Sequence, residues 1–244
     1  MTSTHELVAG ATVPLVVVDE GPIRFLALNR PQSRNALTRE MRAALPAILG
    51  AAERDETVRT VVITGVDPAF SAGVDTRDND PLRPVLPSPG EVLRAARKPI
   101  IAAVNGACVT GALELALSCS FIIASELAFF ADTHARMGLL PSWGLTALLP
   151  EAVGARRARH MLATGERIDA GTAVAWGLAN EVVAHDRLLQ RCREIGAAVA
   201  ATPDGALEPI LTGVDAGVRS ARSAALAAEH EAFTRTRLRT ADDG

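Results

Sequence analysis

The sequence has no strong excess of charge of either sign. Its 25 Lys and Arg residues are matched by 28 Asp and Glu residues, which leaves a formal net charge of −3. These charges are spread along the chain, so no strong field is available to attract nucleic acid or an anionic membrane surface. We therefore expect neither nucleic acid nor a membrane as a partner.

Long hydrophobic runs are also absent. The longest ones, such as residues 15–18 and 121–124, are far shorter than the roughly 20 residues that cross a bilayer as a helix. The N-terminal residues do not show a basic segment followed by an apolar one, the pattern of a secretory signal. We expect a cytoplasmic protein.

Cysteine is scarce, and its spacing matches no known motif. The chain has three cysteines, Cys108, Cys119 and Cys192, an odd number with neither zinc-site nor redox spacing and no accompanying histidine cluster. We expect them to be small buried apolar side chains. Neither a metal site nor a metal or redox cofactor is expected.

What the sequence does contain is typical of one large α/β domain. With 244 residues, of which 48% are hydrophobic, the chain can bury one substantial core, and we expect a single domain over residues 1–244. Short β-rich runs alternate with small residues and helical patterns, the rhythm of repeated strand-and-helix layers. Strands are predicted over residues 15–18, 23–28, 58–64, 99–104 and 121–124, the first two forming a hairpin.

Helices are predicted mainly from apolar spacing. Thr38 is the expected N-cap of a helix that runs to about residue 54, although Pro46 lies inside it. Apolar residues at helical spacing predict further helices over residues 186–201 and 216–239. Residues 75–90 contain four prolines and are predicted to be a surface loop.

Two segments carry features of a catalytic site. The strand at residues 61–65 runs into the small residues 68–75, which allow a sharp turn with exposed N–H groups; by itself this pattern is more often an ordinary turn. The second segment follows a strand and starts a helix near Gly111. A helix start has unpaired N–H groups and a partial positive charge, which stabilise a developing oxyanion.

Glu114 lies one turn into the helix that is predicted to start near Gly111. It is flanked by Leu113 and Leu115, and a carboxylate in such apolar surroundings usually has a partner or a task. The alternative is a surface glutamate that favours the helix dipole.

The order of three motifs resembles the crotonase family, also called the enoyl-coenzyme A hydratase and isomerase family, from about Val16 to about Phe233. The motifs are LNRP at 28–31 with NAL at 35–37, AFSAGVD at 69–75, and PIIAAVNG at 99–106 with Gly111 and Glu114. The resemblance implies an α/β crotonase-like fold of repeated ββα units. Its spiral core would cover about residues 1–185, and a helical oligomerisation region about residues 186–244.

The resemblance also implies the roles of site residues. The N–H groups of Val74 and Gly111 would form an oxyanion hole, and Glu114 would be an acid/base carboxylate. The implied substrate is an acyl-coenzyme A thioester, coenzyme A being part of the substrate rather than a cofactor. Residues expected to line its path are Ala36, Ala72, Asp75, Thr76, Thr110 and Trp143, and Arg34 is a candidate phosphate contact. The implied assembly is a homotrimer or a dimer of trimers.

One departure from the family concerns the second catalytic carboxylate. Where hydratases with two glutamates carry the second one, this sequence has His134, whose imidazole is suited to proton transfer near neutral pH. Either His134 replaces that group or it merely packs, and Asp132 is the second candidate. An acid/base role requires His134 to face Glu114.

Other departures concern the substrate. Thr110 and Ala112 flank Gly111 where many family members carry glycine, and Trp143 places a large ring in a segment that is usually small, which predicts a reshaped acyl pocket. Core packing is the alternative for Trp143, in a chain with 3% aromatic residues. Arg235, Arg237 and Arg239 are expected to form a solvated face.

The leading functional prediction is reversible hydration of a 2-enoyl-coenzyme A thioester, a lyase (hydro-lyase) reaction of fatty acid metabolism. Two main-chain donors would stabilise the enolate oxygen, and loss of one such donor costs about 3 kcal/mol in the barrier. The alternatives are isomerisation, decarboxylation or carbon–carbon cleavage through the same enolate, or acyl-coenzyme A binding without catalysis.

Overall fold

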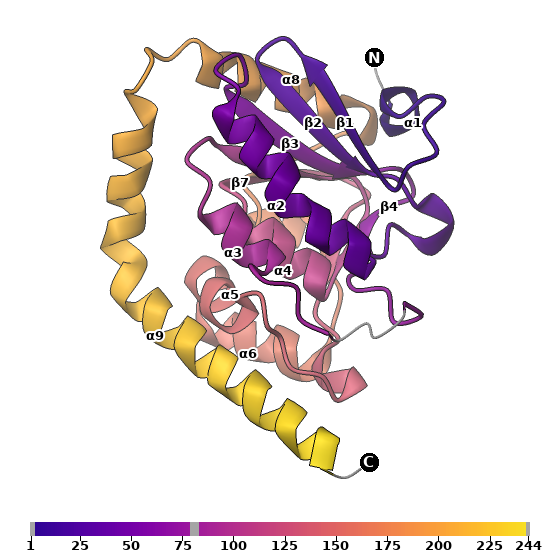
Figure 1. The fold of residues 1–244 in the computed structure, drawn as a ribbon, viewed down its shortest axis with the longest axis vertical. Helices are drawn as coiled ribbons and strands as arrows, with labels where there is room; N and C mark the ends of the chain where they lie inside the picture. The colour runs from indigo at the N-terminus through magenta and orange to yellow at the C-terminus, as the bar shows by residue number, and fades with distance from the viewer. Residues whose placement is uncertain (1–2, 79–82, 243–244) are drawn as a thin grey trace.

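The computed structural model describes residues 3–78 and 83–242, with the side chains of residues 218–221 and 237–242 outside the described part. Pro81 of the predicted loop and the side chains of Arg237 and Arg239 therefore lie outside the described residues. Two sheets are surrounded by helices, and one long helix runs along the outside of the molecule (Figure 1).

The larger sheet has six strands in the order β1-β2-β3-β5-β7-β10. The predicted hairpin is confirmed, because β1 and β2 pair antiparallel; the other neighbours are parallel. These strands are β1 (Leu15–Glu20), β2 (Ile23–Leu28), β3 (Thr60–Gly65), β5 (Ile100–Val104), β7 (Phe121–Ser125) and β10 (Glu181–Val183).

The smaller sheet alternates with the larger one along the chain. Its four strands, in the order β4-β6-β8-β9, are β4 (Ala69–Ser71), β6 (Ala107–Val109), β8 (Phe129–Ala131) and β9 (Ile168–Asp169). Each of β3, β5 and β7 is followed by a strand of the smaller sheet and then by a helix. The repeated ββα unit that the resemblance implied is therefore confirmed.

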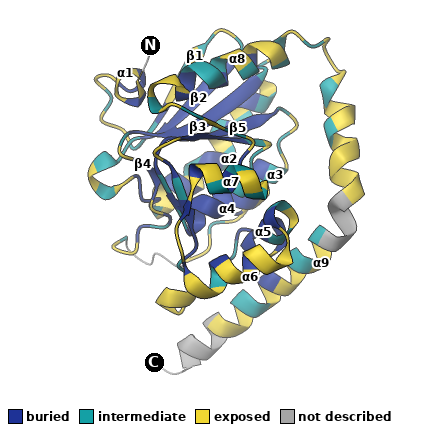
Figure 2. Ribbon diagram, turned by 180° about the vertical axis from the view of Figure 1, so that it is seen from behind, coloured by how far each residue is buried: buried dark blue, intermediate teal, exposed yellow. Residues whose placement is uncertain are grey.

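Helices cover both faces of the larger sheet (Figure 1). The alternation of side chains along β2 shows how: Phe25 and Ala27 pack with Cys192 of α8, whereas Leu26 and Leu28 pack in the core shared with α2 and α4. Because β2 and β3 are buried along their whole length, both faces of the sheet are covered there. Figure 2 shows α4 and these strands as the buried centre of the molecule.

The helices of the described ranges begin and end as follows: α1 (Thr4–Leu7), α2 (Arg39–Arg54), α3 (Pro89–Arg94), α4 (Gly111–Leu117), α5 (Leu145–Val153), α6 (Ala155–Thr164), α7 (Ala170–Trp176), α8 (Leu188–Ala200) and α9 (Leu207–Asp242), with 3-10 turns η1 (Pro31–Ser33), η2 (Ala135–Met137) and η3 (His185–Arg187). None of the helices in these ranges is both long and apolar enough to cross a membrane.

Two helix predictions differ in outcome. Thr38 caps α2, its hydroxyl accepting a hydrogen bond from the Met41 N–H at 3.2 Å, and the helix continues through Pro46 as expected. The last helix starts at Leu207, well before the predicted residue 216. Pro209 lies in its first turn, where the missing N–H of proline would have no intrahelical partner anyway.

The cysteines are free thiols in different surroundings. Cys108 and Cys192 are fully buried, one in each of the two apolar cores, as expected for small apolar side chains. Cys119 is only partly buried and packs at the edge of one core. Burial raises the pKa of Cys192 to about 12, so this thiol is protonated at neutral pH.

Candidate active site

A cavity of about 800 Å³ collects most of the predicted site residues. Its wall is built from the segments after β4, before α3, at the start of α4, around η2, before α5, and from the second half of α9. The predicted residues that line it are Ala36, Ala72, Val74, Asp75, Thr76, Thr110, Glu114, His134 and Trp143.

The two expected oxyanion donors lie close together: Val74 lines the cavity, whereas Gly111 does not line it and lies beside Val74 and the Trp143 ring. A Cβ placed on Gly73 would lie 3.2 Å from the nitrogen of Gly111, and a Cβ on Gly111 would lie 3.5 Å from Cγ2 of Val74. Within residues 3–78 and 83–242, no hydrogen bond uses the N–H of Val74 or Gly111 as its donor. Two adjacent unpaired N–H groups can bind an anionic oxygen.

Pairing with Leu37 fixes the Val74 donor. Val74 forms an isolated parallel bridge with Leu37, in which the neighbours of Val74 make the hydrogen bonds: the N–H of Leu37 donates to the Gly73 carbonyl, and the N–H of Asp75 donates to the Leu37 carbonyl. The N–H of Val74 itself is thereby turned away from this pairing. Gly73 has φ +90°, a conformation that suits glycine.

Thr110, the N-cap of α4, adopts a strained backbone conformation. Its φ of 59° is uncommon for any residue other than glycine and is strained for a β-branched one, at a cost of order 1–3 kcal/mol. The strain is held by two contacts: the Thr110 N–H donates to the Ala131 carbonyl at 3.0 Å, and its hydroxyl bonds that of Thr133 at 2.7 Å. Gly111 follows directly, and its N–H is the first free donor of α4.

Glu114 is buried but reaches the cavity. Its side chain is 2% exposed, and its Oε1 accepts hydrogen bonds from the main-chain N–H groups of Trp143 at 2.7 Å and Leu145 at 3.3 Å. Burial raises the pKa of Glu114 to about 7, against the opposing effect of the nearby His134. A carboxyl with this pKa can both accept and release a proton near neutral pH.

His134 faces Glu114, as an acid/base role requires. Its Nε2 lies 3.7 Å from Oε2 of Glu114, and its Nδ1 lies 2.6 Å from Oδ1 of Asp132. Burial lowers the pKa of His134, but the hydrogen bond with Asp132 and the charge of Glu114 raise it by more, so the pKa lies above its ordinary value. Asp132 is 1% exposed and orients the ring, while the other ring nitrogen is directed at Glu114.

Asp75 holds the loop that carries the first donor. Its buried carboxylate accepts hydrogen bonds from Arg30 at 2.8 Å and from Arg77 at 3.3 Å. Burial raises its pKa, but these hydrogen bonds outweigh that effect and leave the pKa below its ordinary value. Arg30, which also donates to the Ala36 carbonyl at 2.5 Å, therefore ties two predicted site segments together.

Of the two remaining predicted site residues, Trp143 lines the cavity and Arg34 does not. The Trp143 ring is 6% exposed and lines the cavity, and a Cβ on Gly111 would lie 3.0 Å from its Cζ3. The two roles considered for this ring, packing and shaping the acyl pocket, are therefore compatible. Arg34 is exposed and does not line the cavity, although its carbonyl accepts the N–H of Ala72; its phosphate contact stays a prediction.

The contribution of α9 to the cavity was not predicted from the sequence. His230, Phe233 and Thr234 line the cavity, and the buried Glu229 accepts hydrogen bonds at the start of α5. The sequence did contain a signal for a buried role of Glu229. At helical spacing it lies between Leu226 and Phe233, which places a charged residue on the apolar side of the helix.

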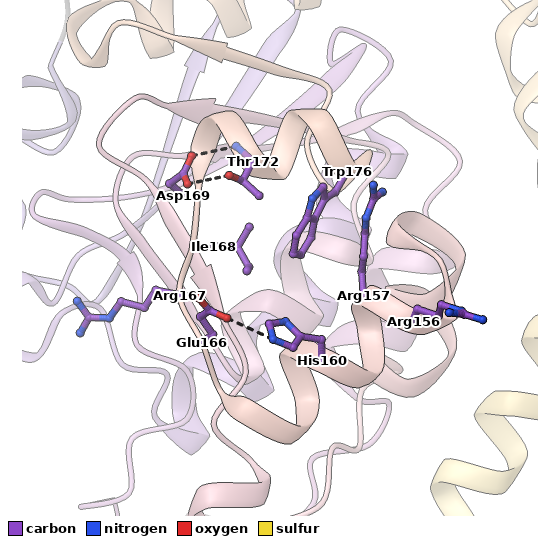
Figure 3. Close-up of a pocket in the computed structure, with 9 residues that line it drawn as sticks. All are labelled: Arg156, Arg157, His160, Glu166, Arg167, Ile168, Asp169, Thr172 and Trp176. Carbon is purple, nitrogen blue, oxygen red and sulfur yellow. Dashed lines mark hydrogen bonds and ion pairs between the residues drawn. The ribbon is translucent and has the colours of Figure 1, made fainter.

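A second cavity, of about 420 Å³, lies between α6 and α7 and contains none of the predicted residues (Figure 3). Several of its polar side chains are engaged locally: His160 pairs with Glu166 at 3.5 Å, and Asp169 caps α7 through Thr172. Arg157 lies 5.2 Å from the centre of the Trp176 ring.

Comparison with known proteins agrees with this geometry. Residues 20–242 match the family described as enoyl-CoA hydratase/isomerase. A crystal structure of an enoyl-CoA hydratase from Mycobacterium avium is 43% identical, with a TM-score of 0.87 over 94% of this chain and 100% of that one. The Arabidopsis thaliana protein named "Probable enoyl-CoA hydratase 1, peroxisomal" is 35% identical over 87% of this chain and 82% of its own length. A 1,2-epoxyphenylacetyl-CoA isomerase of Escherichia coli K12 is 32% identical over 76% of this chain and 75% of its own.

Proposed function

Because the chain belongs to the enoyl-CoA hydratase/isomerase family, we propose that it catalyses the reversible addition of water to a 2-enoyl-coenzyme A thioester. The family acts on acyl-coenzyme A thioesters, and the proposed reaction makes the protein a hydro-lyase. The observation that carries the proposal is the placement of the Glu114–His134 pair in the wall of a cavity that Val74 also lines, with the unpaired N–H groups of Val74 and its neighbour Gly111 close by.

In the proposed reaction, the thioester carbonyl oxygen lies between the N–H groups of Val74 and Gly111. Ionised Glu114 takes a proton from water, and the hydroxide adds to Cβ of the double bond. The electron pair moves to the carbonyl oxygen as an enolate, which the two donors stabilise. Protonated His134 then delivers a proton to Cα.

The proton balance closes within the site. After the addition, Glu114 is protonated and His134 is neutral, and a proton passes from Oε2 of Glu114 to Nε2 of His134 across the 3.7 Å that separates them. Asp132 favours the protonated imidazole through its 2.6 Å contact with Nδ1. The proposed cycle uses these side chains and main-chain groups without a metal or redox cofactor.

The test is incubation with crotonyl-coenzyme A, following the absorbance of the conjugated thioester and the product mass. We expect loss of conjugation together with a gain of one water, abolished in Glu114→Gln. The matched control is Glu56→Gln, the same substitution at an exposed site, which should keep full activity. Binding of several enoyl thioesters without any change in mass would rule out the proposed hydration, and an unchanged absorbance as well would leave acyl-coenzyme A binding without catalysis.

A second candidate is isomerisation of the double bond. The pair that faces the cavity combines one carboxylate with one imidazole rather than two carboxylates, and such a pair can move a proton between Cα and Cγ of the same enolate. The same assay separates the two reactions, because isomerisation shifts the double bond with unchanged mass.

We also propose that the protein is a cytoplasmic homotrimer or dimer of trimers with a role in fatty acid metabolism. Support for assembly comes from the first half of α9, where Ile210 and Val214 are 63% and 65% exposed. Sedimentation of the purified protein tests the assembly, and fractionation of the producing cell tests the location. A monomer at micromolar concentration would contradict the assembly.

A further inference from the structure

The carboxylate of Glu229 lies buried at the start of α5, although Glu229 belongs to α9. The residue is 7% exposed. Its Oε1 accepts the N–H of Gly144 at 2.7 Å, and its Oε2 accepts both the N–H of Thr146 at 2.8 Å and the Thr146 hydroxyl at 2.5 Å. Because α5 has no N-cap side chain of its own, a carboxylate from another helix satisfies its first N–H groups.

The same short segment also holds Glu114. The N–H groups of residues 143 and 145 donate to Glu114, and those of residues 144 and 146 donate to Glu229. Successive N–H groups thus point alternately to the acid/base carboxylate and to Glu229. A shift of the segment away from Glu229 would therefore also move the donors that hold Oε1 of Glu114.

A third side chain holds the segment from α3. Nη1 of Arg94 donates to the Trp143 carbonyl at 2.6 Å and to the Ser118 hydroxyl at 3.1 Å. The space around Gly144 is filled, because a Cβ there would lie 2.9 Å from Arg94 and 3.2 Å from Leu226 of α9. The segment is therefore held between α3, α4 and α9.

The ring of Trp143 connects this segment with the oxyanion donors. It packs on Gly111, whose added Cβ would lie 3.0 Å from the ring. The position of the ring is set by the main chain of residues 143–146, and that main chain is held by Glu229.

We infer that Glu229 is a positioning residue for the proposed hydration: by holding the start of α5 it fixes the Glu114 carboxylate and the Trp143 ring against the oxyanion donors. This inference rests on the proposed function for its kinetic part. With Glu229 in this role, the geometry of the site depends on the packing of α9 against α5. A second contact between these two helices is the ion pair of Arg222 with Glu151 at 2.6 Å.

Electrostatics agree with the geometry. The charge of Glu229 is among the causes that raise the pKa of Glu114, after burial and against the effect of His134. The other charged groups that face Glu114 are His134 from the start of η2 and Arg94 from α3. Replacing Glu229 by a neutral side chain should therefore lower the pKa of Glu114.

The test compares Glu229→Gln with Glu231→Gln, the same substitution at an exposed position of the same helix. In Glu229→Gln one accepting oxygen becomes an NH₂ group, which cannot accept the hydrogen bonds that residues 144 and 146 donate. The main chain of residues 143–146 should therefore be held less firmly. We expect kcat to fall about 10- to 100-fold, the size of effect that small misplacements cause, with a smaller change in KM. The acid limb of the pH profile should move to lower pH, and Glu231→Gln should match the parent enzyme.

Two further measurements test the positioning role of Glu229 separately. Thr146→Val removes one of the three hydrogen bonds to Glu229 and should reduce kcat less than Glu229→Gln does. In a Trp176→Phe background, Trp143 is the single tryptophan, and its fluorescence should be quenched more readily by acrylamide in Glu229→Gln than in Glu231→Gln. This readout does not depend on hydration, so it tests the positioning role even if no water is added.

Unchanged kcat, pH limb and Trp143 quenching in a folded Glu229→Gln protein would overturn the inference. Increased quenching together with an inactive parent enzyme would support the positioning role and reject the proposed reaction.

Discussion

The interaction between Glu114 and His134 predicts how the pH dependence of activity responds to removal of the imidazole. In the proposed reaction Glu114 must be ionised, so kcat/KM should rise with pH through about 7, the pKa of this buried carboxyl. Below about pH 6 the ionised fraction falls about tenfold per pH unit, and kcat/KM should follow it. Activity should fall again at higher pH as His134, whose pKa is raised, loses its proton.

The perturbation is His134→Ala. The charge of His134 lowers the pKa of Glu114, so its removal should move the acid limb to higher pH. At 3.7 Å, two unit charges interact by about 1 kcal/mol even with the screening of bulk water. Since 1.36 kcal/mol correspond to one pKa unit, the limb should move by about one pH unit, and further if screening is weaker. The alkaline limb should disappear, and kcat should fall about 10²- to 10⁴-fold with the general acid.

The assay is kcat/KM for crotonyl-coenzyme A from pH 5 to 9 at constant ionic strength. His160→Ala is the control, because His160 is about half exposed and pairs with Glu166 in the second cavity. An acid limb at the parent pH, together with full kcat, would refute the reasoning and show that His134 only packs. The acid limb should move to higher pH in His134→Ala and to lower pH in Glu229→Gln. General destabilisation of the protein would not produce shifts in opposite directions.

Two substitutions test other parts of the site. Gly111→Ala should lower kcat about tenfold or more, because its Cβ would press on the Trp143 ring at 3.0 Å beside the oxyanion donors; Gly213→Ala, with open space around its Cβ, is the control in the same assay, and equal rates would argue against an oxyanion role for Gly111. Asp132→Asn should lower the pKa of His134 and shift the alkaline limb of kcat/KM to lower pH, because it replaces the carboxylate bonded to Nδ1; an unmoved limb would show that Asp132 does not stabilise the imidazolium.

Much of the main-chain part of the site could be predicted from short stretches of sequence. The small residues around Gly73 and the helix start at Gly111 each follow a strand, which marks both as places with exposed N–H groups. The contacts that hold them, Val74 with Leu37 and Thr110 with Ala131, join segments farther apart in the chain. The N-cap Thr38 and the hairpin of β1 and β2 were also predictable, and these two features depend on neighbours a few residues apart.

The side-chain contacts of the site were harder to predict from the sequence. Glu114 could be named because a carboxylate among leucines needs a partner, but its partners are the N–H groups of Trp143 and Leu145 and the ring of His134, from other elements. Glu229 was missed because its contact at the start of α5 joins distant parts of the chain. Apolar spacing on α9 indicates which side of the helix is buried, without indicating what lies opposite.

Residue type and spacing were enough to predict the strands of the first hairpin, the cap of α2 and the resemblance to the family, and that resemblance in turn implied Val74 and Gly111 as main-chain donors. The pKa of about 7 for Glu114, the orientation of His134 by Asp132 and the contribution of Glu229 from α9 became visible with the folded chain. The physical reason is that burial and charge–charge interaction depend on distances between elements that the chain brings together only when it folds.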